Sequence, residues 1–141
     1  MLHDVASDPG ELTPTELYDR YLAEVRTVID DHGTEATAES SGIDRATIEA
    51  LSGGETPELT LEEAANILAV VEDAPDGETI ATIARDELLM GMTTAVLDVE
   101  AVESGLDGEL EAREIQSKVE GRFPMTLREF ATLHQFIDGR R

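Results

Sequence analysis

Hydrophobic residues recur at helical spacing along most of the chain. Between residues 14 and 31 they fall three or four positions apart, which places them on one face of a helix. Residues 61–71 repeat this pattern, and so does the longer segment 78–104, which fits one helix or two. In the longer segment, Gly91 and Asp98 are the positions where a helix could bend or restart. No segment alternates for long enough to indicate a strand, so the sequence predicts an all-α fold.

Polar residues at the ends of these segments predict where the helices begin and end. Thr13 and Glu16 have the spacing of a capping box, and Thr60 and Glu63 repeat it. Gly33 suits the end of the first helix. Residues 1–13 precede the first helix and are expected to form a flexible lead-in, from which Leu2 and Val5 could pack back on the body.

Residues 34–53 have the pattern of two short helices joined by a tight turn. Ala38 falls where the helices must approach closely, and Gly42 falls in the turn, where a positive φ suits a residue without Cβ. Asp44 can cap the second helix. Three apolar residues would hold that helix down: Ile43, Ile48 and Leu51. This spacing is that of a helix-turn-helix.

Together with the helices on either side, this stretch resembles the DNA-binding domain of the lambda-repressor/Cro-like family over residues 14–73. The resemblance implies a bundle of four to five helices. It also implies that the second helix of the motif faces the bases, through Arg45, Ala46, Thr47 and Glu49. Arg45 could read a guanine and Thr47 could reach a phosphate, whereas Glu49 would repel phosphates. The alternative is an unrelated helical hairpin.

Three short segments of the first half recur in order in the second half. Residues 41–44 are echoed by 104–107, residues 51–53 by 119–121, and residues 59–65 by 125–131. These echoes predict two helical units, 14–74 and 77–139, packed on each other. The second copy is diverged, because residues 108–112 lengthen its turn.

The charge is strongly negative, with 32 acidic and 10 basic residues giving a net charge of −22. Only Lys118 is a lysine. Such a composition resembles that of cytoplasmic proteins from salt-in halophiles, and the chain is similar to small acidic haloarchaeal proteins of a family with no assigned function. At molar salt the Debye length is about 3 Å, so acidity by itself says little about nucleic-acid binding. The alternative is an ordinary acidic protein that binds a partner.

Charge is distributed unevenly along the chain. Residues 1–110 hold 4 basic and 27 acidic residues, whereas residues 111–141 hold 6 basic and 5 acidic residues. The second segment could therefore meet a phosphate backbone without strong repulsion. Its candidate nucleic-acid contacts are Arg113, Lys118, Arg122 and Arg128. The alternative is that these side chains form salt bridges with the acidic first unit.

No arrangement of residues indicates catalysis, a cofactor or a metal site. The chain has no cysteine, and its three histidines are far apart in sequence. It has no glycine-rich phosphate loop and no nucleophile motif. The first residues do not form a signal peptide, and no stretch approaches the about 18 apolar residues of a membrane span, so the expected location is the cytoplasm.

These observations favour a non-enzymatic regulatory protein that binds DNA, acting in transcription. The alternative is a protein–protein adaptor that reuses the same helical fold. The chain could act as a monomer, in which the two units form a pseudo-twofold pair, or as a homodimer.

Overall fold

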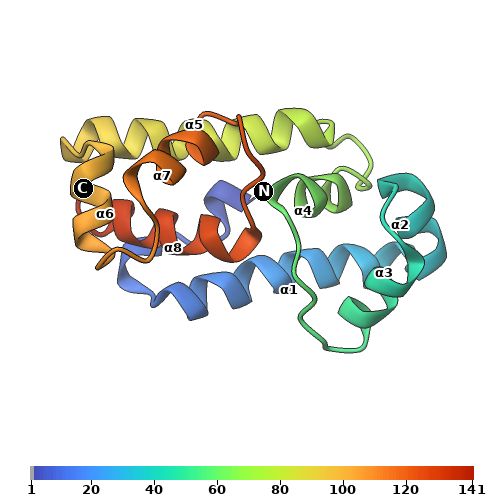
Figure 1. Ribbon diagram of the computed structural model, residues 1–141. Helices are drawn as coiled ribbons and strands as arrows, with labels where there is room; N and C mark the ends of the chain where they lie inside the picture. Colours follow the sequence, from blue (N-terminus) through green and yellow to red (C-terminus); the bar gives the residue numbers. More distant parts are fainter. Residues whose placement is uncertain (1) are drawn as a thin grey trace.

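The computed structural model describes residues 2–141, and over this range all regular secondary structure is helical (Figure 1). This confirms the all-α prediction. Eight α-helices follow two short 3-10 helices, η1 (Leu2–Asp4) and η2 (Pro9–Glu11). The α-helices are α1 (Pro14–His32), α2 (Thr34–Ser41), α3 (Arg45–Ser52), α4 (Leu61–Leu68), α5 (Gly77–Ala95), α6 (Val99–Gly105), α7 (Ala112–Val119) and α8 (Leu127–Asp138).

The two long helices enclose the core. Figure 1 shows α1 and α5 on opposite sides of α4 and α8, with α2 and α3 at one end and α6 and α7 toward the other. Helix α8 packs along α1, and α4 packs along α5. The core side chains are mostly aliphatic, and among the largest that are fully buried are Leu17, Tyr21, Leu61 and Phe130.

Two backbone hydrogen bonds join the starts of α4 and α8. The amide of Leu61 donates to the carbonyl of Met125 at 2.7 Å, and the amide of Leu127 donates to that of Leu59 at 2.8 Å. Between them, Thr60 and Thr126 form an isolated antiparallel bridge. Each of these threonines also completes a capping box with the glutamate three residues later. The beginnings of two helices from different halves of the chain are thereby fixed to each other.

The long apolar segment 78–104 forms two helices. Helix α5 ends at Ala95, and its C-cap Val96 has a left-handed φ of 57°. The side chain of Asp98 then caps α6 by accepting from the amide of Ala101. Helix α5 continues through Gly91 without a break. The missing side chain of this glycine gives room to Ile137, because a Cβ at Gly91 would lie 2.7 Å from Cγ2 of Ile137.

Residues 2–13 lie against the helices. Leu2 is fully buried, and Val5 packs partly against the core. The amide of Gly10 donates to a carboxylate oxygen of Asp138 at 2.8 Å, and a Cβ at Gly10 would lie 2.6 Å from the backbone of Gly139. These contacts pack residues 2–13 against the body of the protein, as the sequence suggested for Leu2 and Val5.

Candidate functional site

Helices α2 and α3 are joined by the three residues 42–44. Gly42 has a φ of 75°, and its amide donates to the carbonyl of Ala38 at 3.0 Å. Ile43, Ile48 and Leu51 are all buried. The expected side-chain cap by Asp44 is wrong: its side chain makes no capping hydrogen bond, and its carbonyl accepts from the first turn of α3 instead. The turn is therefore fixed by the backbone and by the apolar residues of α3.

The outward face of α3 carries the residues that the sequence singled out as base contacts. Arg45, Ala46 and Glu49 are exposed, and Thr47 is half-buried. Nε of Arg45 lies 2.9 Å from a carboxylate oxygen of Glu49, one helical turn away. Both side chains are more than half exposed, so this ion pair is worth at most about 0.5 kcal/mol and Arg45 can leave it at little cost.

Lys118 lies between two carboxylates. Its Nζ is 2.8 Å from Glu114 and 2.6 Å from Glu129, and its side chain is 14% exposed. Burial by itself lowers the pKa of Lys118, but the two carboxylates outweigh this effect and raise it above its ordinary value. The hydrogen bond from Lys118 lowers the pKa of Glu114. The charge of Lys118 is thus balanced within the protein.

The other three basic candidates are placed differently from one another. Arg122 pairs with Glu120 at 2.9 Å on an exposed surface. The guanidinium of Arg128, on α8, lies 4.3 Å from the ring centre of Tyr18, on α1. Arg113 is exposed and forms no hydrogen bond or ion pair within residues 2–141. The structure brings Arg113 and Lys118 to one hollow but places Arg128 on a different part of the surface.

That hollow has a volume of about 520 Å³ and is lined by α7 and the loop that follows it. Phe123 and Pro124 belong to its lining, and Phe123 is 62% exposed. Sequence reasoning missed Phe123. The available signal was a lone aromatic residue in a glycine- and proline-containing loop, outside every periodic segment.

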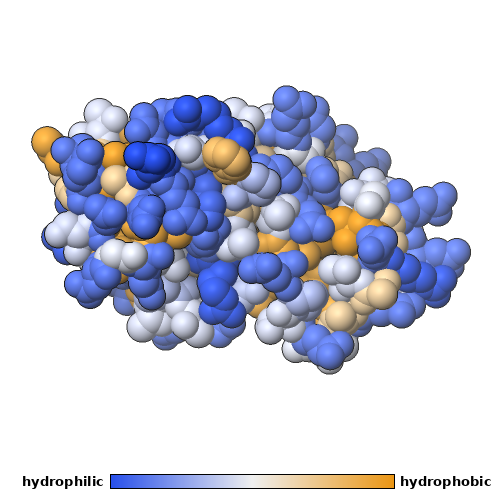
Figure 2. Space-filling view, viewed as in Figure 1, coloured by the Kyte–Doolittle hydropathy of each residue, from blue (hydrophilic) through white to orange (hydrophobic). Residues whose placement is uncertain are grey.

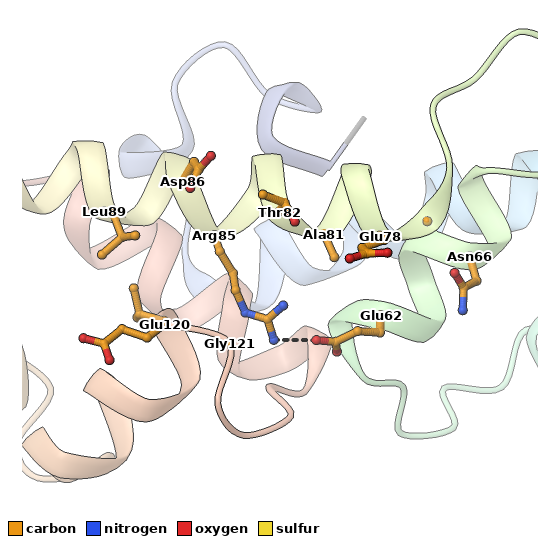
Figure 3. A pocket seen from close by; sticks show the side chains of 12 residues that line it. Glu62, Asn66, Glu78, Ala81, Thr82, Arg85, Asp86, Leu89, Glu120 and Gly121 are labelled. Carbon is orange, nitrogen blue, oxygen red and sulfur yellow. Dashed lines mark hydrogen bonds and ion pairs between the residues drawn. The ribbon is translucent and has the colours of Figure 1, made fainter.

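A second hollow, of about 510 Å³, lies between α4, α5 and the end of α7. Figure 3 shows Arg85 extending from α5 across this hollow to Glu62 on α4, with Glu78 beside them. Arg85 bonds to Glu62 and donates from Nε to the carbonyl of Lys118 at 2.9 Å. A single arginine therefore links three helices. Sequence reasoning missed this role, because a lone arginine in an amphipathic helix resembles any solvated residue.

A smaller hollow of about 270 Å³ continues along α5 towards α6. Leu89 lines this hollow and the 510 Å³ hollow and is 41% exposed, and the next residue, Met90, is 63% exposed.

The face in Figure 2 is mostly hydrophilic, and a hydrophobic area interrupts it between α3 and α4. Exposed apolar surface is thus present at more than one place on the molecule.

Within residues 2–141, no group of three or more histidine, cysteine, aspartate or glutamate side chains has an arrangement that could hold a metal ion. No helix in the same range is long and apolar enough to cross a membrane.

Comparison with known proteins identifies a family for most of the chain. Searches of curated proteins and of solved structures each found no significant match. None of the comparisons supports the resemblance to the lambda-repressor/Cro-like domain, which stays a hypothesis. Residues 17–140 match the model of the "Family of unknown function (DUF5791)", and the protein therefore belongs to that family.

Proposed function

We propose that this chain is a non-enzymatic protein-interaction module built on a helix-turn-helix-like scaffold. The observation that carries this proposal is the set of large hydrophobic side chains left exposed on the second half of α5 and on the loops after α5 and α7. Val96 is 89% exposed, Met90 63%, Phe123 62% and Leu89 41%. Large apolar side chains that remain exposed at a surface are candidates for a site that another protein covers.

The composition of this surface supports a protein partner. Phenylalanine, methionine and arginine are enriched at protein interfaces, and Arg113 lies with Phe123 on the same hollow. Arg113 is exposed and unpaired within residues 2–141, so it is available to a partner. The aromatic ring supplies apolar area and the guanidinium supplies a directed polar contact.

The second candidate function is the regulatory DNA binding predicted from the sequence. The geometry of α2, the short turn and α3 favours it, because the exposed N-terminal part of α3 carries Arg45 and Thr47. The charge around this motif opposes it: residues 14–74 hold 3 arginines and 15 acidic residues. Three of the four basic candidates in the second unit already contact groups within the protein. For these reasons we rank DNA binding second.

The same proposal includes an internal duplication, with α1–α4 and α5–α8 as the two units. Helices α1 and α5 are each 19 residues long, and α3 and α7 are each 8 residues long. The two hydrogen bonds between residues 59–61 and 125–127 correspond to each other: in each, the amide of the first residue of α4 or α8 donates to the carbonyl of the residue two positions before the other helix. In the second unit, six residues (106–111) separate α6 from α7, whereas three separate α2 from α3. The proposed second copy has therefore lost the short turn.

The proposed setting is the cytoplasm of a salt-in halophile, as the net charge of −22 suggests. There, screening by molar salt would let an acidic module approach acidic partners.

The test is crosslinking of the tagged protein in its own cells at native salt, with bound DNA and bound proteins identified in parallel. We expect one defined protein partner, lost in the double variant Met90→Ser/Phe123→Ser and retained in Val71→Ser. Val71 is a matched control because it is also an exposed hydrophobic residue, at 40%. Sharp promoter peaks that vanish with Arg45→Ala would instead establish the DNA-binding function.

A further inference from the structure

The two hollows beside α5 adjoin each other, and together they are called the groove. They share Leu89, Val119 and Glu120 in their linings, so the boundary between them is formed by side chains that face both. Helix α5 has 19 residues, which corresponds to about 28 Å of helix. A groove of this form along a helix is suited to a chain segment rather than to a small molecule.

The two ends of the groove differ in chemistry. At the end near the start of α5, Glu62 and Glu78 lie close to Arg85, as Figure 3 shows. At the other end, the lining includes the apolar residues Met92 and Val99 together with Asp98 and Gln116, and Leu89 lies between the two ends. A segment that fills the groove must therefore present cationic groups at one end and apolar groups at the other.

The acidic end is not neutralised by the protein itself. Arg85 is the one cation in its lining, and Arg85 uses its donors on Glu62 and on the carbonyl of Lys118. Glu78 is exposed and forms no ion pair or hydrogen bond through its side chain within residues 2–141. The groove thus keeps a free carboxylate beside an apolar surface, which complements a basic amphipathic partner.

The other half of the molecule shows how an equivalent position is filled. Tyr18 is the fifth residue of α1, and Ala81 is the fifth residue of α5. Likewise, Arg128 is the second residue of α8, and Glu62 is the second residue of α4. On the first side, the guanidinium of Arg128 covers the ring of Tyr18 at 4.3 Å. On the second side, an alanine and a carboxylate stand at these positions, and Arg85 reaches the carboxylate of Glu62 across the hollow.

We propose that the groove between α4, α5 and α7 docks a basic amphipathic segment of a partner protein. An arginine or lysine of that segment lies against Glu78 and Glu62, and its apolar residues pack on Leu89, Met92 and Val99. This inference rests on the proposed protein-interaction function and adds a contact region that shares Leu89 with the exposed hydrophobic side chains.

The probe is a fluorescein-labelled helical peptide of about 16 residues, long enough to form a helix against a surface, with leucines on one face and arginines on the other. A second peptide carries citrulline, which is neutral, in place of each arginine. Binding is measured by anisotropy in 1 M potassium chloride, where the Debye length of about 3 Å suppresses general attraction to an acidic protein. Changes in the NMR chemical shifts of the protein's backbone amides on addition of the peptide map the contact.

We expect the arginine peptide to shift amides of α4, α5 and α7, and to bind at least about tenfold more tightly than the citrulline peptide, a difference of about 1.4 kcal/mol. Glu78→Gln and Leu89→Ser should each weaken binding several-fold. Glu24→Gln and Val71→Ser are the matched controls, since both residues are exposed and lie outside the groove. Circular dichroism confirms that each variant is folded.

Equal binding of the two peptides, or shifts spread over α1, α2 and α3, would overturn the groove assignment. So would unchanged binding by both groove variants. The broader function is tested separately by crosslinking in cells: if the cellular partner is lost with Met90→Ser/Phe123→Ser but kept with Leu89→Ser and Glu78→Gln, the interaction module stands and the groove proposal fails.

Discussion

The phenol oxygen of Tyr21 lies 2.6 Å from Nδ1 of His134, and this hydrogen bond connects α1 with α8 inside the core. Both residues are buried, and the ring of Phe130 packs against each of them, with its centre 5.4 Å from that of Tyr21 and 5.2 Å from that of His134. Burial raises the pKa of Tyr21, so the phenol keeps its proton at any ordinary pH. The pair is therefore a neutral polar link between helices from the two ends of the chain.

The first prediction concerns acid stability. Burial lowers the pKa of His134 below its ordinary value of 6.5, although the nearby Glu87 and Asp138 oppose this shift. Above that value the imidazole is neutral in both the folded and the unfolded protein. As the pH falls below it, the unfolded chain takes up a proton before the folded protein does, so the free energy of unfolding decreases until the pH reaches the lowered pKa. Urea unfolding between pH 7.5 and 5 measures this loss.

The control for this prediction is His134→Leu. The variant has no imidazole to protonate, so the difference in its stability between pH 7.5 and pH 5.5 should be smaller than that of the original protein. Carboxylate titration affects both proteins and cancels in the comparison. An identical pH dependence in the two proteins would exclude His134 as the cause.

The second prediction concerns Arg85, which links α4, α5 and α7. Replacing it by methionine keeps most of the aliphatic stem but removes the bonds to Glu62 and to the carbonyl of Lys118. We expect a loss of about 1–3 kcal/mol in the free energy of unfolding, since a hydrogen bond to a charged group is typically worth this amount. Chemical denaturation gives the value.

Arg20→Met is the matched control for Arg85→Met. Arg20 is exposed on α1, so its replacement should change the stability by no more than about 0.5 kcal/mol. Equal effects of the two substitutions would show that the contacts of Arg85 add nothing to stability.

The third prediction is a stabilising substitution at Thr37 in α2. Thr37 is fully buried, and its hydroxyl has no hydrogen-bond partner. Because an unsatisfied buried hydroxyl is costly, Thr37→Val should raise the free energy of unfolding by about 1 kcal/mol. Threonine and valine have similar shape and similar helix propensity, so the change isolates the hydroxyl.

Thr27→Val provides the comparison for Thr37→Val, because Thr27 is exposed on α1 and its hydroxyl donates to the carbonyl of Ala23. Its thermal midpoint should not rise. A lower midpoint for Thr37→Val than for the original protein would mean that the hydroxyl of Thr37 is satisfied in solution.

The fourth prediction concerns salt. With a net charge of −22, the folded chain repels itself unless counterions screen it. The Debye length is about 3 Å in 1 M salt and about 30 Å in 0.01 M salt, so helical content should fall as salt is withdrawn and return when it is restored. Circular dichroism at 222 nm, which reports helical content, follows this reversible change. Equal helical content at both salt concentrations would contradict the proposed halophilic adaptation.

Local features of the fold could be predicted from the sequence because their causes lie within a few residues. The capping boxes at Thr13 and Thr60 are present, since a threonine and a glutamate three positions apart meet whenever a helix begins there. The sequence also predicts the left-handed Gly42. It offers Asp98, together with Gly91, as a position where the long segment could bend or restart, and Asp98 is the N-cap of α6. Asp44 is the exception: the sequence allowed its side chain to cap α3, but the turn is held by the backbone.

The candidate site depended on contacts that cross the chain. Sequence spacing could suggest the pair of Lys118 with Glu114, one helical turn apart, but not the contact with Glu129, which comes from another helix. In the same way, the sequence alone does not show that the guanidinium of Arg128 lies over the ring of Tyr18, which belongs to another helix. Whether a basic residue can reach a partner is decided by such contacts.

The sequence by itself determined the helical class, most helix starts and the acidic surface, because periodicity, capping and net charge are properties of neighbouring residues and of composition. Only the tertiary structure decided which cations are balanced within the protein and where a groove remains open. The hollow beside α5 is lined by residues of α4, α5 and the end of α7, which lie far apart in the sequence, and such a space is defined only once these helices have been packed around it.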